Sequence, residues 1–184
     1  MVPEQASALQ ALTAIGGAEA RRVVTQLVTD RIVQGPTLAT ALSAAAALGA
    51  PLPPSRLAEL LRDAAPSIRA GACRCVRLAA PQLAPLTELL DDLHPHVATA
   101  AAIALGRIGR PEARPRLIAL LRTQPSAEVI EALTPIADEE VIVAFGRAAR
   151  AMPDLTRPVL EALDQLDDPR AAWLHQHCKR TRRR

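Results

Sequence analysis

Aromatic residues are almost absent from this 184-residue chain, which contains one Phe, one Trp and no Tyr. Globular cores and β-sheets usually rely on bulky aromatic and β-branched side chains, so the composition argues against a sheet. Ala, Leu, Val and Ile dominate instead. A core of such side chains requires helices that pack closely in thin layers.

Long apolar runs are also missing. The longest uncharged stretch, residues 32–55, is interrupted by Gly35 and by four prolines, whereas a membrane-spanning helix needs ~20 consecutive apolar residues. The first ten residues, MVPEQASALQ, lack the basic and apolar segments of a signal peptide. We therefore expect a cytoplasmic protein with no membrane span.

Cysteines are few, and their number is odd. Cys73, Cys75 and Cys178 fit no disulfide framework, so we expect reduced thiols that pack as small apolar side chains.

Motifs that carry chemistry are missing as well. The chain has no glycine-rich phosphate loop, no Gly-x-Ser-x-Gly elbow, no His-Glu-x-x-His and no Cys-x-x-Cys. A closed zinc site needs four converging ligands, and the candidate ligands fall in two separate clusters: His94 and His96, and His175, His177 and Cys178. We expect no metal, no cofactor and no enzymatic activity.

Lysine is nearly absent, and the cations that remain are unevenly placed. Lys179 is the single lysine among 22 basic residues, and this preference for arginine, with abundant Ala and Pro, suggests a GC-rich bacterial genome. The five cations of the last six residues leave a body with 17 basic and 19 acidic residues. A body without a basic excess is not built as a whole to follow a phosphate backbone.

What the chain does have is a repeat of about thirty residues. Pairs of apolar residues end a predicted helix four times, at spacings of 33, 29 and 31 residues: Leu27-Val28, Leu60-Leu61, Leu89-Leu90 and Leu120-Leu121. An aliphatic residue followed by glycine stands 12 residues ahead of three of these pairs: Ile15-Gly16, Leu48-Gly49 and Ile108-Gly109. Glycine adopts the left-handed backbone that ends many helices, so the pattern predicts helices paired across short turns.

We predict a single domain over residues 1–178, an all-α, right-handed α-solenoid of about six antiparallel helical hairpins, followed by a basic tail at 179–184. The predicted hairpins cover residues 3–30, 36–63, 66–92, 95–123, 126–150 and 154–180. Proline is expected to open helices at Pro95, Pro111 and Pro169. Serine is expected to cap helices at Ser55, Ser67 and Ser126.

The fourth hairpin is the clearest, reading HVATAAAIALGRIGRPEARPRLIALL from His96 to Leu121. Its Ala-rich first helix, Leu-Gly-x-Ile-Gly close and final Leu pair resemble the short HEAT-like repeats of the phycobilisome-lyase type. The resemblance covers nearly the whole chain and is strongest in hairpins one and four. It implies a HEAT-like solenoid, and it raises a lyase or chromophore-handling subunit as one alternative, although no residue set of this chain supports that chemistry.

Stacked repeats place equivalent side chains next to one another, which predicts two columns. The first should bring Arg110 beside Asp138, and its charges either pair between repeats or form a bipolar patch: Gly17, Ala50, Arg110, Asp138 and Asp168. The second lies at the ends of second helices, where arginines either complement the helix dipole or form a ridge leading into the tail: Thr29, Arg62, Arg122, Arg150 and Arg180.

The leading hypothesis is a protein-binding scaffold or adaptor, and the alternative is nucleic-acid binding through the arginine edge and the tail. The tail is either functional or merely solubilising. Trp173 is expected to pack the final hairpin together with Ala171, Ala172 and Leu174. The candidate partner-binding residues are Arg62, Arg107, Arg110, Arg114, Arg116, Arg122, Arg150, Lys179, Arg180, Arg182, Arg183 and Arg184.

Overall fold

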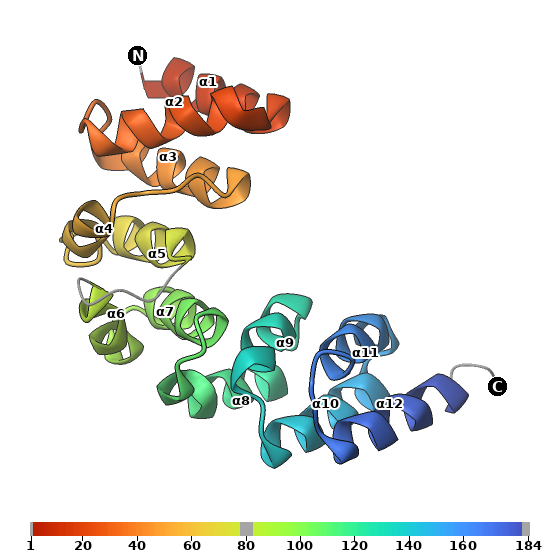
Figure 1. The fold of residues 1–184 in the computed structure, drawn as a ribbon. Coiled ribbons are helices and arrows are strands. Elements are labelled where there is room, and N and C mark those ends of the chain that lie inside the picture. Colours follow the sequence, from red (N-terminus) through yellow and green to blue (C-terminus); the bar gives the residue numbers. More distant parts are fainter. Residues whose placement is uncertain (1, 78–82, 182–184) are drawn as a thin grey trace. The chain divides into compact units, whose positions relative to one another are not determined.

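A computed structural model describes residues 2–77 and 83–181, and their side chains over 4–77 and 83–179. Over these ranges the chain forms twelve α-helices and short 3₁₀ turns, with no strand (Figure 1). The helices fall into two compact units, Met1–Ala104 (unit 1) and Leu105–Arg184 (unit 2). In each unit helix pairs stack in chain order, which confirms the predicted all-α solenoid of HEAT type.

Unit 1 is built around three successive first helices. Helix α3 packs against α1 on one side and α5 on the other, while α2 contacts α3 and α4 contacts α5. The helices of this unit are α1 (Val2–Ile15), α2 (Gly17–Thr29), α3 (Gly35–Leu48), α4 (Pro54–Leu60), α5 (Pro66–Cys75) and α6 (Pro85–Glu88); α7 (Pro95–Arg107) begins here and ends in unit 2.

Unit 2 has two layers of helices. Helices α9 and α11 pack together in one layer, and α10 lies between α8 and α12 in the other. Contacts of α8 with α9, α10 with α11 and α11 with α12 join the layers. The helices are α8 (Arg114–Thr123), α9 (Ala127–Leu133), α10 (Glu139–Ala151), α11 (Thr156–Leu163) and α12 (Pro169–Thr181).

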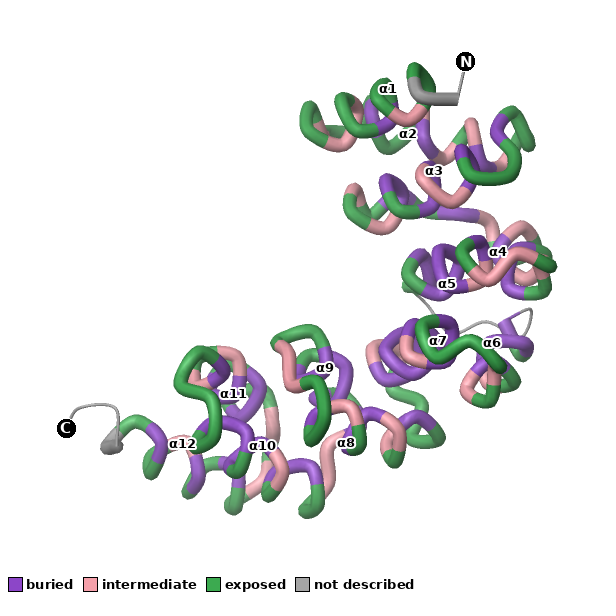
Figure 2. Tube along the Cα trace, turned by 180° about the vertical axis from the view of Figure 1, so that it is seen from behind, coloured by how far each residue is buried: buried purple, intermediate pink, exposed green. Residues whose placement is uncertain are grey.

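Small side chains set the spacing between helices. Ala41 and Ala45 of α3 are fully buried, and Figure 2 shows α5 mostly in the colour of buried residues. Among the glycines, the closest approach is at Gly106 near the end of α7, where an added Cβ would strike the carbonyl oxygen of Ala132 and lie 2.7 Å from Leu117 Cδ1. Since backbone atoms cannot move aside as a flexible side chain can, only glycine fits at this crossing.

Helix starts agree with the proline predictions and only partly with the serine predictions. Pro95 and Pro169 begin α7 and α12, and Pro111 begins the 3₁₀ turn Pro111–Ala113 that precedes α8. The predicted cap at Ser126 is confirmed, because its hydroxyl accepts a hydrogen bond from the Val129 N–H at 3.3 Å. The caps predicted at Ser55 and Ser67 are wrong: both residues lie inside helices that begin one residue earlier, at a proline.

An aspartate three residues ahead of the proline orders two of these starts instead. Asp63 Oδ1 accepts a hydrogen bond from the Ala65 N–H at 2.8 Å, and Asp92 Oδ1 accepts one from the His94 N–H at 2.9 Å. Short acidic side chains commonly bond the backbone two residues on. The spacing Asp-x-x-Pro was a signal in the sequence that the serine prediction overlooked.

None of the helices in the ranges that the structure describes combines the length and the apolar character needed to cross a bilayer.

Candidate interaction surface on helices α10 and α12

Four of the predicted partner-binding arginines are ion-paired within unit 2. The shortest pairs are Arg110 with Glu112 and Arg114 with Asp138, both at 2.7 Å. The others are Arg107 with Glu128 and Glu131, both at 3.2 Å, and Arg122 with Glu140 at 3.5 Å. Ion pairs, most of them between neighbouring helices, therefore engage most of the charged residues of the fourth and fifth hairpins.

The sequence predicted Arg110 beside Asp138, but a different arginine pairs with Asp138. Asp138 binds Arg114, while Arg110 binds Glu112 of its own turn. Arg114 also donates from Nε to the carbonyl oxygen of Ile136 at 3.2 Å. Equal spacing along the repeat pointed to Arg110, but Arg114 opens α8 and its long side chain reaches Asp138, the cap of α10.

The other predicted residues divide into exposed, half-buried and undescribed positions. Arg62 follows α4 in unit 1 and is exposed, as are Arg150 in the last turn of α10 and Lys179 in α12. Arg116 in α8 is half-buried. The side chain of Arg180, and Arg182, Arg183 and Arg184, lie outside the described residues.

Trp173 corrects the sequence prediction most clearly. Its side chain is 64% exposed and stacks on the ring of His177, with centroids 5.2 Å apart and an interplanar angle of 13°. Ala171, Leu174 and Cys178 form the buried face of α12, at the i, i+3, i+7 spacing of one helix face. Trp173 is adjacent to these residues in sequence but lies on a different face, which helical periodicity would have revealed.

A hollow of about 270 Å³ beside Trp173 is lined by residues of α10 and α12. Its apolar wall includes Val143, which is 47% exposed. Gly146 brings the helices close, since an added Cβ would lie 3.1 Å from Leu174 Cδ1. The lining residues are Ile142, Val143, Gly146, Arg147, Arg150, Arg170, Trp173 and Leu174.

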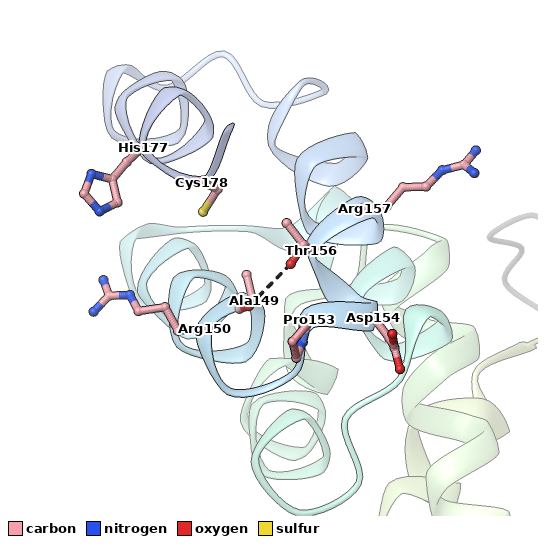
Figure 3. Close-up of a pocket in the computed structure, with 8 residues that line it drawn as sticks. All are labelled: Ala149, Arg150, Pro153, Asp154, Thr156, Arg157, His177 and Cys178. Carbon is pink, nitrogen blue, oxygen red and sulfur yellow. Dashed lines mark hydrogen bonds between the residues drawn. The ribbon is translucent and has the colours of Figure 1, made fainter. Parts of the chain in front are cut away.

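A second hollow of about 520 Å³ lies where α10 ends and α12 passes over the start of α11. Figure 3 shows His177 and Arg150 extending on the same side of it, while Asp154 and Arg157 lie on the other side. Thr156 at its back donates a hydrogen bond to the carbonyl oxygen of Ala149 at 3.4 Å. Arg150 lines both hollows.

Two guanidinium groups beside these hollows are available to a partner. Arg147 and Arg150 make no ion pair or hydrogen bond with any residue that the structure describes, whereas Arg170 binds Glu139 at 2.9 Å. We call the set Val143, Arg147, Arg150, Arg170, Trp173 and His177 the arginine–tryptophan surface. It combines exposed apolar area with unpaired positive charge.

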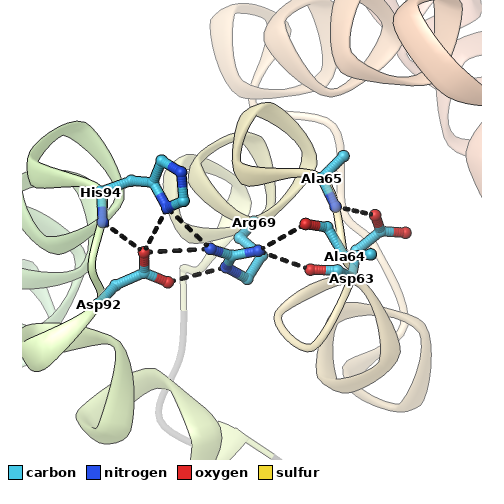
Figure 4. A network of polar contacts seen from close by, with 6 residues as sticks. All are labelled: Asp63, Ala64, Ala65, Arg69, Asp92 and His94. Atoms are coloured by element: carbon cyan, nitrogen blue, oxygen red, sulfur yellow. Dashed lines mark hydrogen bonds and ion pairs between the residues drawn. The ribbon is translucent and has the colours of Figure 1, made fainter.

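A second polar cluster, in unit 1, has the opposite character. Arg69 donates to both carboxylate oxygens of Asp92, at 2.8 and 3.1 Å, and to the carbonyl oxygens of Asp63 and Ala64, at 2.8 and 3.0 Å (Figure 4). The hydrogen bond from Arg69 is the main reason that the pKa of Asp92 falls from 3.8 to about 2. Every donor direction of this guanidinium is directed at the protein itself, so the cluster is structural.

The thiols and histidines of the described chain are poorly placed for chemistry. Burial raises the pKa of Cys73 to about 12 and that of Cys75 to about 11, so both thiols stay protonated near neutral pH. His175 lies 3.0 Å from Asp164 while His177 stacks on Trp173. Among the residues described, no group of three or more His, Cys, Asp or Glu is gathered as metal ligands would be.

Stacked helical hairpins define a class, the α-helical repeat proteins. Within this class, the family model for HEAT repeats matches residues 52–137. The matched residues are therefore HEAT repeats, and the stacked helix pairs make the chain HEAT-like in its repeats. HEAT repeats commonly mediate protein interactions. The phycobilisome-lyase subtype stays a prediction. No curated protein and no solved structure matches the chain.

Proposed function

We propose that this protein is a non-catalytic protein-interaction scaffold and that its partner binds the arginine–tryptophan surface. The observation that carries the proposal is an exposed Trp173 beside Val143, next to Arg147 and Arg150, which make no ion pair or hydrogen bond with a described residue. Trp and Arg are the residues that most often dominate the energy of protein interfaces. The match of residues 52–137 to HEAT repeats, which commonly bind proteins, supports the same function.

The proposal keeps only part of the binding set expected from the sequence. Arg150 belongs to the surface, and Lys179 lies in the same helix as Trp173. Arg107, Arg110, Arg114 and Arg122 are engaged in ion pairs within unit 2, so their contribution to a partner would require breaking those pairs. Arg62, Arg116 and the basic tail remain predictions, as do the cytoplasmic location and the bacterial origin.

The test is affinity capture with matched variants. The purified chain, Trp173→Ala and Leu93→Ala serve as baits, and retained proteins are compared by quantitative mass spectrometry. Leu93→Ala is the control because Leu93 is a 94% exposed apolar residue in unit 1. This substitution removes exposed apolar area without altering the arginine–tryptophan surface. We expect a partner that the chain and Leu93→Ala retain and Trp173→Ala loses; retention of the same partners by all three baits would contradict the proposal.

Nucleic-acid binding is the second candidate, because an aromatic ring beside arginines also suits an unstacked base. This function predicts an affinity that falls steeply as salt rises. A fluorescently labelled single-stranded oligonucleotide, titrated at low and at physiological salt, measures that slope. No binding at low salt would remove this candidate.

We do not propose the lyase alternative. Cys73 and Cys75 are buried with raised pKa values, and the histidines of α12 diverge. These groups offer neither a nucleophile nor a convergent acid–base pair.

A further inference from the structure

We infer that the arginine–tryptophan surface recognises an acidic protein segment in which carboxylates flank one large apolar side chain. The inference rests on the proposed function and names the chemistry of the partner. It depends on the order of features along the surface: an apolar hollow, then Arg150, then a second hollow bordered by His177.

The apolar part provides a place for one side chain. Ile142, Val143, Trp173 and Leu174 line the first hollow on two helices. Trp173 and Val143 leave much of their surface in water, and covering that area with an apolar group is favourable in proportion to the area buried. Because the hollow is small and open at a surface, it fits a protruding phenylalanine or leucine.

The cationic part surrounds this anchor. Arg147 and Arg150 are three residues apart on α10, so their side chains leave the same side of the helix. Planar guanidinium groups bind carboxylates in a bidentate fashion. The third arginine, Arg170, is neutralised by Glu139, and Glu140 is bound to Arg122, so the unpaired charge is concentrated at Arg147 and Arg150.

A chain leaving the first hollow meets Arg150 before it enters the second. Arg150 and His177 approach that hollow from α10 and α12 (Figure 3), which suits a second carboxylate placed between them. The far side of that hollow holds Asp154 beside Arg157, and Arg157 is paired with Glu161 at 2.8 Å, so this side offers little attraction to a continuous run of negative charge such as a phosphate backbone. The chain has a single Trp and no Tyr, whereas stacking of successive bases uses several aromatic rings. A short acidic peptide segment is therefore favoured over nucleic acid.

The chain provides its own local probe, because Trp173 is its one tryptophan. Covering an exposed indole shifts its emission to shorter wavelength. The titrant is a synthetic peptide of glutamates with one central phenylalanine, acetylated and amidated at its ends. The comparison titrant replaces each glutamate by glutamine. We expect a blue shift that saturates with the glutamate peptide, with an affinity at least about tenfold above that of the glutamine peptide.

Charge reversal provides the second readout. The double variant Arg147→Glu, Arg150→Glu is expected to weaken binding of the glutamate peptide by about tenfold or more, through lost attraction and new repulsion. The control, Arg21→Glu with Arg74→Glu, changes net charge by the same amount at exposed arginines of unit 1 and should alter affinity less than about twofold. Circular dichroism of both variants verifies that the helices are retained.

Three results would overturn the inference. Equal binding of the glutamate and glutamine peptides would show that the arginine–tryptophan surface does not recognise carboxylates. Equal losses of affinity in the two double variants would show that the net charge of the protein, and not Arg147 and Arg150, attracts the peptide. A blue shift with a single-stranded oligonucleotide and none with the glutamate peptide would replace the acidic segment by nucleic acid. If a captured partner depends on Trp173 while the peptide fails, the partner chemistry is wrong but the scaffold function stands.

Discussion

Arg69 lies near the start of α5 in unit 1, and Arg150 lies near the end of α10 in unit 2. The two arginines have different roles. Arg69 is 14% exposed and donates hydrogen bonds to Asp92 and to two backbone carbonyls. Arg150 is exposed and has no ion pair or hydrogen bond with any described residue. In the sequence the two residues look alike, because each is an arginine on a predicted amphipathic helix.

The difference shows that an arginine count is a poor guide to a binding surface. A guanidinium with all its donors satisfied inside the protein stabilises a helix junction and has little left to offer a partner. A guanidinium without protein partners keeps its donors directed at water, and those donors can bind a carboxylate of a partner. Whether a given arginine belongs to the first or the second kind depends on the carboxylates that the fold brings to it.

The largest expected effect is at Arg69. Arg69→Ala leaves Asp92, whose side chain is 7% exposed, without its cation, and breaking such a pair typically costs about 3–5 kcal/mol. We expect unfolding free energy, measured by urea titration with circular dichroism, to fall by roughly 2–4 kcal/mol. Arg74→Ala on the same helix is the matched control because Arg74 is exposed. Similar losses for both variants would contradict a structural role for the Arg69 cluster.

Acid should weaken the same junction. The folded pKa of Asp92 is depressed from 3.8 to about 2, so its stabilising contribution is complete above about pH 4 and is lost as the pH falls from 3.8 towards 2. We expect this part of the acid-induced loss to be absent in Asp92→Asn, which no longer titrates. The measurement is the urea midpoint as a function of pH; identical slopes for the two proteins below pH 4 would contradict the assignment.

Arg114 should be intermediate. Its guanidinium bridges the Ile136 carbonyl and Asp138, the cap of α10, but the pair is only partly buried. Loss of an exposed or half-exposed pair usually costs about 1 kcal/mol or less, and we expect Arg114→Ala to lower stability by about 1 kcal/mol. Arg110→Ala provides the comparison, since among the described residues Arg110 pairs with Glu112 alone, two residues away. An equal or larger effect of Arg110→Ala would favour the column predicted from the sequence.

The smallest effect on stability is expected at Arg150. Exposed substitutions away from special features stay within about 0.5 kcal/mol, and the helix-dipole contribution of Arg150 is of similar size. Arg150→Ala should therefore leave the urea midpoint nearly unchanged while it weakens binding of the glutamate peptide. Arg150→Lys separates the two roles, because it keeps the charge at the helix end but loses the planar fork. A large stability loss in Arg150→Ala would show that this residue also belongs to the fold.

Much of the architecture could be predicted from local signals. The Leu pairs and the Gly turns reflect requirements of a single hairpin: an apolar stripe on each helix and a left-handed residue at the turn, as at Gly49 and Gly109. Pro95 and Pro169 open helices because proline tolerates the first helical position. Such features act within a few residues, so they can be read without knowing the fold.

The surface could not be predicted to the same extent. Asp138 pairs with Arg114 and not with Arg110, and Trp173 is exposed. Both facts depend on the rotation of a helix by less than one turn and on the reach of long side chains. A counting offset along the repeat does not resolve either one. The periodicity of Ala171, Leu174 and Cys178 contained part of the answer for Trp173, and the prediction relied on neighbours in sequence instead of neighbours on the helix face.

The amino-acid sequence by itself determined that this chain forms paired helices with a small, aliphatic core, because helix propensity, turn chemistry and apolar spacing are local properties. Only the tertiary structure decided which charges are neutralised and which remain available. Ion pairs join residues about twenty positions apart, such as Arg107 with Glu128 and Arg114 with Asp138. Their formation depends on distances of a few ångströms, which packing between helices establishes.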